Sequence, residues 1–156
     1  MTTPAEAIAL RDAVPDDAAA ISALVAGLAQ RWIVPDCSAE GAATLLASMA
    51  PERTRERLHE GHRYVVAERG GRLVGVAALR LPSHLYHLFV AEHAQRQGLA
   101  RRLWEAVRVH ADPAAPVTVN ASRHARAVYD RLGFEPVGEE RFDRGIRSTP
   151  MLWRPR

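Results

Sequence analysis

Two adjacent glycines, Gly70 and Gly71, stand between two apolar runs and constrain the fold more than any other feature of the sequence. The runs, 64–67 and 73–79, are rich in valine, and a Gly-Gly pair between such runs predicts a tight antiparallel hairpin. A third apolar run, at 84–90, predicts another strand. The middle of the chain is therefore expected to form three consecutive strands of one sheet.

The hydrophobic period changes at Gly98, where a helical pattern begins. Apolar residues then recur on one helical face and charged residues lie opposite; the apolar ones are Leu99, Leu103, Ala106 and Val107. Residues 117–119 predict a short strand after this helix. A strand–helix–strand crossover that follows an antiparallel hairpin predicts a mixed α/β fold.

The N-terminal third predicts one strand and two helices. Residues 7–11 are expected to form the strand, and Pro15-Asp16-Asp17 to open the first helix with an Asp as its N-cap. One buried stripe of that helix would comprise Ile21, Leu24, Val25 and Leu28. Pro35 ends it, Ser38 caps the second helix, and Pro51 interrupts that helix before a stretch of helical propensity at 52–60.

The C-terminal part predicts a last helix and a hairpin. Ser122 is a suitable N-cap for a helix that runs to Leu132, and Gly133 stands where a C-cap glycine belongs. Residues 134–153 are expected to form two strands around a turn at Arg144-Gly145. We find no internal repeat or linker, which predicts a single domain over residues 1–156.

Composition and charge narrow the classes of function. The chain contains no lysine, its arginines are dispersed, and its net charge is only +3, which does not favour a nucleic-acid partner. No apolar run approaches the ~18 residues of a membrane span, and the first ten residues lack the basic region and apolar core of a secretory signal, so we expect a cytoplasmic protein with no membrane partner. The lone Cys37 excludes an intramolecular disulfide and a multi-cysteine zinc site.

The junction between the strand at 84–90 and the helix at Gly98 is suited to an anion. A polar loop connects them, and the first N–H groups of a helix carry unpaired partial positive charge. Glycine permits a ligand to approach the backbone closely. The segment predicts a diphosphate site, unless it is an ordinary helix start with solvated glutamines.

The segment Gln95-Arg96-Gln97-Gly98-Leu99-Ala100 resembles the Q/R-x-x-G-x-G/A signature of the GNAT superfamily of N-acetyltransferases. Residues 120–134 are similar to the family's second pattern, N-x-S…A…Y-x-x-x-G-F. The resemblance implies a mostly antiparallel, splayed sheet flanked by helices, with acetyl-CoA as co-substrate between the fourth and fifth strands. It also implies transfer of acetyl to a primary amine of a small molecule, a peptide or a protein by direct attack in a ternary complex. The alternative is a non-catalytic acyl-CoA-binding sensor.

The resemblance also implies cofactor-binding residues. Phe89 and Val90 would bind pantetheine through their main chains, and Asn120 would contact the cofactor arm or make only a strand-end hydrogen bond. Arg96 would either add charge to a phosphate or be solvated. The pyrophosphate would lie on the main chain of the loop and helix start, that is on Gln95, Arg96, Gln97, Gly98, Leu99 and Ala100.

Catalytic roles follow from the same resemblance. The N–H of Val90 would polarise the thioester carbonyl, and Tyr129 would be the general acid, if it does not merely pack on the sheet. His84 and His87 are candidate general bases, but three residues apart on a strand they are expected to face opposite sides of the sheet. Glu92 and His93, in the following loop, are the other candidates.

These histidines lack the spacing of common metal motifs, so we expect no metal. The acceptor would be selected by residues 30–35 and 142–147, where Trp32 either walls the acceptor slot or is half-buried packing. The arginines of these segments suit an acceptor that bears a carboxylate better than a polycation. A homodimer is compatible with a small sheet that has exposed edges, but no residue pattern demands one.

Overall fold

The computed structural model describes residues 7–155; the ends of the expected domain, 1–6 and 156, lie outside the described residues. The strands are β1 (Ala9–Asp12), β2 (Arg63–Arg69), β3 (Arg72–Arg80), β4 (His84–Val90), β5 (Val117–Ala121), β6 (Glu135–Pro136), β7 (Arg141–Asp143) and β8 (Ile146–Trp153). The α-helices are α1 (Ala18–Trp32), α2 (Ala39–Ser48), α3 (Pro51–His59), α4 (Leu99–Arg108) and α5 (Arg126–Leu132). Three 3₁₀ turns complete them: η1 (Pro15–Asp17), η2 (Val34–Asp36) and η3 (Glu92–Ala94).

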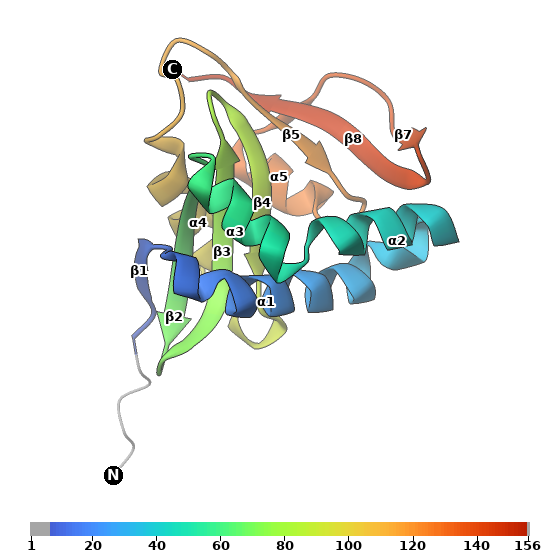
Figure 1. The fold of residues 1–156 in the computed structure, drawn as a ribbon. Helices are drawn as coiled ribbons and strands as arrows, with labels where there is room; N and C mark the ends of the chain where they lie inside the picture. Colours follow the sequence, from blue (N-terminus) through green and yellow to red (C-terminus); the bar gives the residue numbers. More distant parts are fainter. Residues whose placement is uncertain (1–6, 156) are drawn as a thin grey trace.

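One sheet contains the strands in the order β1-β2-β3-β4-β5-β8-β6, and β7 extends it by pairing with β8. Every strand pair is antiparallel except β4 with β5. The helices α1 and α3 cross one face of β2–β4, and α4 lies behind the same strands (Figure 1). The expected mixed fold with a mostly antiparallel sheet is confirmed.

Each face of the sheet has its own apolar core. On the α4–α5 face, Leu103, Trp104 and Val107 pack against β2–β5 and are almost fully buried. On the α1 face, Ile21 and Val25 pack against β2 and β3. Burial on both faces explains why the central strands are continuous apolar runs instead of alternating ones.

Local signals act as expected at most element ends. The hydroxyl of Ser38 accepts the N–H of Gly41 at 3.0 Å and caps α2, and Gly133 ends α5 with a φ of 97°. Gly98 precedes α4 with a φ of 75°. The turn at Arg144-Gly145 connects β7 to β8.

Four expectations near the two ends of the chain need correction. Ser122 does not cap α5, which begins at Arg126 after Ala125; its hydroxyl instead accepts the N–H of Ala125 at 3.3 Å. Asp17 does not cap α1 with its side chain, because its carboxylate is held by Arg11 and by the N–H of Val14. Pro51 starts α3 at the position where a helix tolerates proline, so 51–59 is a separate third helix. The two-residue strand β6 adds a third C-terminal strand.

Candidate active site

A cavity occupies the opening between β4 and β5. These strands pair in parallel at His84 and Thr118, and β5 then pairs along its whole length with β8. The cavity has a volume of about 1030 Å³, at the upper end of the roughly 300–1,000 Å³ of small-molecule sites. One half is lined by α4 and α5, and the other, which we call the α1–α2 half, by α1, α2 and the β7–β8 hairpin.

The main chain of β4 faces the opening at alternate residues. The N–H of Ala91 donates to the carbonyl of Val74 at 2.8 Å, and Val90 is paired with Gly75. Because hydrogen-bonded and non-bonded pairs alternate in an antiparallel ladder, the N–H of Val90 and of Leu88 point away from β3, toward the opening. The N–H of Phe89 points toward β3, contrary to the expectation that the main chain of Phe89 binds pantetheine.

The loop before α4 offers main-chain donors to an anion. The first intrahelical bond runs from the N–H of Arg102 to the carbonyl of Gly98, so the earlier N–H groups are available. A Cβ placed on Gly98 would meet nothing within 4 Å. The residues therefore fit a diphosphate, which needs open space beside a helix start.

The glutamine side chains of this loop brace it. Gln95 donates to the carbonyl of Val90 at 3.0 Å, and Gln97 to that of His93 at 3.4 Å. Arg96 has a φ of 64° and lines the cavity. Arg101 donates to the carbonyl of Arg131 at 2.7 Å and brings a second cation to this end of the cavity.

Tyr129 of α5 lies at the wall of the cavity and is only 6% exposed. Its ring packs edge-on against Phe134, with centroids 5.4 Å apart. Burial raises the pKa of its phenol above the usual range, which keeps the hydroxyl protonated. A raised pKa suits a hydrogen-bond donor to a developing thiolate better than complete transfer of the phenolic proton.

His84 and His87 lie on the same face of the sheet, so the expectation of opposite faces is wrong. The register shifts so that Ala78 pairs with His87 while Leu79 pairs with Leu85. The extra residue of this bulge turns His87 to the α1 face, where it contacts Tyr64 and Phe89. His84 lies beside Thr118. The neighbours of Thr118 along β5, Val117 and Val119, point into the core on the α4–α5 face, so Thr118 and His84 lie on the α1 face.

Both imidazoles are neutral at physiological pH. Burial lowers the pKa of His87 to about 3, and the nearby Arg57 guanidinium adds to this effect. Burial likewise lowers the pKa of His84 to about 4, helped by Arg80. Both side chains line the cavity.

The remaining predicted residues divide between the cavity and the surface. Asn120 lines the cavity from the face of β5 that carries Thr118. Glu92 forms an ion pair with Arg31 at 2.7 Å outside the cavity lining, and His93 is exposed beside it.

Trp32 combines the two roles considered for it. It lines the cavity, and it stacks on His124 with ring centroids 4.1 Å apart. Neither His124 nor Leu88 is predicted as a site residue from the sequence, because neither stands at a specified position of a motif. Strand register and long-range packing alone bring them to the cavity.

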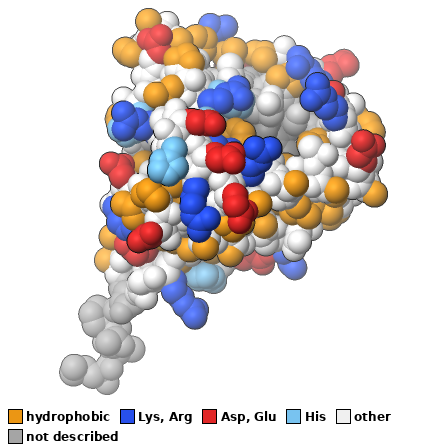
Figure 2. Space-filling view, viewed as in Figure 1, with side chains coloured by type: hydrophobic (Ala, Val, Ile, Leu, Met, Phe, Trp, Pro, Cys, Tyr) orange, Lys and Arg blue, Asp and Glu red, His pale blue; other side chains and the backbone are white. Residues whose placement is uncertain are grey.

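Charge on the α1–α3 face is mixed rather than gathered into one basic patch (Figure 2). Within residues 7–155 no helix has the length and apolar character that crossing a membrane requires. The same range contains no group of three or more potential metal-ligating side chains.

Comparisons with known proteins place the fold. Residues 33–155 match the family model of an acetyltransferase (GNAT) domain. No curated protein matches the chain significantly. A GCN5-related N-acetyltransferase structure from Rhodopseudomonas palustris is similar, with a TM-score of 0.79, 23% identity, and coverage of 99% of this chain and 98% of that one.

Two similar structures contain coenzyme A or acetyl-CoA. PaiA N-acetyltransferase from Thermoplasma acidophilum, in complex with coenzyme A, has a TM-score of 0.76 at 13% identity over 95% of this chain and 99% of that one. A phosphinothricin acetyltransferase from Sinorhizobium meliloti, in complex with acetyl-CoA, has a TM-score of 0.68 at 18% identity over 93% and 86%. At these identities the likeness concerns the fold.

Proposed function

The chain belongs to the GNAT acetyltransferase family, and we propose that it transfers the acetyl group of acetyl-CoA to a primary amine by direct attack in a ternary complex. The observation that carries this proposal is the strand opening itself. It places the N–H of Val90 between a loop suited to a diphosphate and a separate half-cavity with room for a second ligand.

Acetyl-CoA as co-substrate would supply the acyl group: the amine nitrogen bonds to the carbonyl carbon, the C–S bond breaks, and CoA leaves as a thiol with the proton that the nitrogen loses. The single cysteine, Cys37, lies outside the cavity lining and contacts the carbonyl of Ile33. Its position supports direct attack, since no thiol stands ready for an acyl-enzyme.

The chain's own residues have distinct roles in this proposal. Main-chain groups of Leu88 and Val90 hold the pantetheine arm, and the Val90 N–H stabilises negative charge on the carbonyl oxygen. Residues 95–100 hold the pyrophosphate, and Asn120 contacts the arm. The hydroxyl of Tyr129 donates a hydrogen bond to the departing sulfur.

The amine's proton passes to a neutral imidazole of the α1–α2 half, directly or through water. His84 and His87 are the two candidates that line this part of the cavity. Their low pKa values keep both rings unprotonated, so a ring nitrogen can accept a hydrogen bond from the amine. The same low values make each ring a weak base, so the proton does not stay on the imidazole and ends on the sulfur of CoA.

Thermal denaturation with acetyl-CoA, CoA and ATP tests the cofactor site. At about 100 times its dissociation constant a ligand adds roughly 2.7 kcal/mol of apparent stability, so acetyl-CoA and CoA should raise Tm by several degrees and ATP should not. Release of CoA thiol in the presence of a panel of amines then tests turnover. Stabilisation without thiol release on any amine would favour an acyl-CoA-binding sensor instead.

A further inference from the structure

The α1–α2 half of the cavity is mainly apolar. Its wall includes Leu28 and Trp32 of α1, Leu45 of α2, Met49 directly after α2, Phe89 of β4 and Ile146 of β8. The two histidines at its β4 side are neutral. A ligand with an apolar or aromatic body would be desolvated favourably here.

The charged groups of this half lie at the β7–β8 hairpin. Arg144 and Arg147 line the cavity, and Asp143 is the one carboxylate among the described residues that line it. A polycationic acceptor would therefore meet more positive than negative charge. An acceptor with a negative group would instead be attracted by the excess of positive charge.

The guanidinium of Arg147 has N–H donors that no residue among 7–155 occupies. Its guanidinium is 4.0 Å from Oε2 of Glu140. That carboxylate is already engaged by Arg123, whose Nε and Nη2 donate to its two oxygens at 2.5 and 2.8 Å. The guanidinium carbon of Arg147 instead lies 4.5 Å from the centre of the Phe142 ring, a cation–π contact that restrains the side chain.

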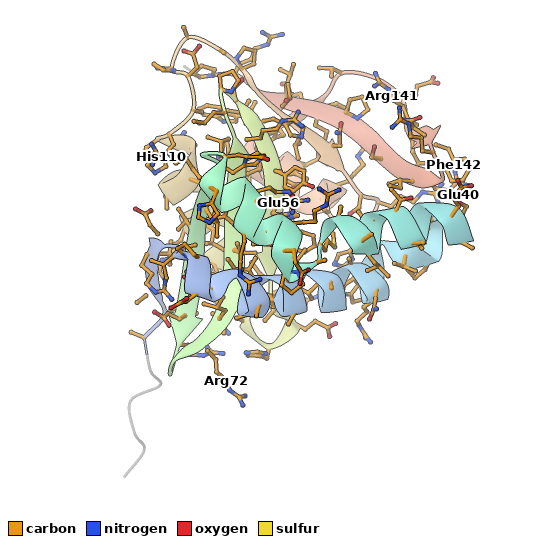
Figure 3. The ribbon with its side chains drawn as sticks, viewed as in Figure 1. Glu40, Glu56, Arg72, His110, Arg141 and Phe142 are labelled. Carbon is orange, nitrogen blue, oxygen red and sulfur yellow. The ribbon has the colours of Figure 1, made fainter. Side chains whose placement is uncertain are left out.

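The hairpin that carries Arg147 is fixed against α2. The N–H of Ser38 donates to the carbonyl of Gly145 at 2.9 Å, and Gly41 packs directly on Gly145. Phe142 and Glu40 mark this junction at the outer edge of the molecule (Figure 3). The guanidinium is thus held in place before a ligand arrives, which reduces the entropy cost of binding.

We propose that the acceptor is an amine with an apolar or aromatic body that also bears a carboxylate, as a hydrophobic amino acid does, and that Arg147 binds that carboxylate. This inference rests on the proposed acetyl transfer and names its substrate class. An oriented guanidinium pairs with a carboxylate through two parallel hydrogen bonds.

The test uses the full chain and two matched pairs of amines. Phenylalanine is compared with phenethylamine, and leucine with isoamylamine, since the members of each pair differ only in the carboxylate; spermidine represents polycations. We expect kcat/KM, measured by thiol release, to be about 10- to 100-fold higher for each amino acid than for its amine, the range for a charge-assisted contact. Equal or better turnover of the amines or of spermidine would overturn the inference and leave acetyl transfer intact.

Variants assign the effect to Arg147. Arg147→Gln should lower kcat/KM at least 10-fold more for phenylalanine than for phenethylamine, mainly through KM, while Arg147→Lys restores part of the preference. Arg141→Gln, an exposed arginine of the same hairpin that lies outside the cavity lining, is the matched control and should keep the preference. Equal losses on both amines would contradict the role of Arg147. Calorimetry with acetyl-CoA runs beside these assays, because absence of cofactor binding would refute the proposed function itself.

Discussion

Nδ1 of His84 lies 2.7 Å from Oγ1 of Thr118, and these two residues also form the paired position between β4 and β5. A side-chain hydrogen bond therefore stands at the point from which the two strands diverge. The N–H of Thr118 additionally donates to the carbonyl of Ser83 at 2.9 Å. The narrow end of the opening is thus held by both side-chain and main-chain contacts.

Removal of this hydroxyl should weaken the junction. Thr118→Val keeps the shape of the side chain but leaves a half-buried imidazole nitrogen without its partner, at a cost of about 1–2 kcal/mol. Thr118→Ser retains the hydroxyl and is the control. Urea denaturation measures the free energy of unfolding, and equal stability of the Val and Ser variants would show that the contact contributes nothing.

Acid should destabilise the protein through the same two histidines. Their folded pKa values, about 4 and about 3, lie below the unfolded value of roughly 6.5. The unfolded chain therefore binds more protons between these limits, so the contribution of the neutral rings is complete above about pH 6.5 and is lost as pH falls toward the folded pKa values.

Variants make this pH dependence measurable. His84→Gln and His87→Gln should each reduce, by about one, the number of protons that the chain takes up on unfolding. The free energy of unfolding should then fall less steeply between pH 6.5 and 4. An unchanged slope in both cavity variants would mean that these rings ionise normally.

Gly98→Glu should abolish cofactor binding without unfolding the chain. The position has a φ of 75° and open space above it, so any side chain incurs a similar backbone cost of roughly 1–2 kcal/mol. Gly98→Ala shares that cost without the bulk and negative charge that would oppose a pyrophosphate. Calorimetric titration with CoA separates the two: equal affinities would place the pyrophosphate elsewhere.

Tyr129→Phe should lower kcat and spare cofactor affinity. The ring would keep its packing against Phe134, while the donor to the leaving sulfur is lost, for which we expect a reduction of about 100-fold. Steady-state kinetics with saturating acetyl-CoA measures it. If kcat at the optimum pH is unchanged, the hydroxyl has no part in the reaction.

The sequence predicts elements well where the signal is local. Gly70-Gly71 marks the β2–β3 hairpin, Ser38 caps α2, and Gly133 ends α5, because each feature acts within a few residues. The bulge at Tyr86 has no such signal. It is a property of the pairing between β3 and β4, and it reverses the side of the sheet on which His87 lies relative to simple alternation.

The residues of the candidate site are likewise of two kinds: those that a local motif marks and those that only the fold brings together. The loop at 95–100 is contiguous, so a short motif identifies it. The α1–α2 half is assembled from helices and a hairpin far apart in the chain, and the contacts of Arg147 with Phe142 and Glu140 depend on where the hairpin docks. Sequence segments therefore indicate which residues surround the acceptor but not which guanidinium remains unneutralised.

The docking of that hairpin predicts opposite effects for two glycine substitutions. A Cβ on Gly41 would overlap the carbonyl of Gly145, whereas one on Gly27, exposed on α1, would meet nothing within 4 Å. Both glycines are helical, so Gly27→Ala should stabilise the chain by about 0.5–1 kcal/mol. Gly41→Ala should destabilise it by about 1–3 kcal/mol.

Displacement of the hairpin would also move Arg147, so Gly41→Ala should raise KM for the acceptor more than KM for acetyl-CoA. Thermal denaturation and steady-state kinetics on the two variants measure both effects. Stabilisation by both substitutions would mean that α2 and the hairpin separate readily, and the rigid placement of the guanidinium would then not hold.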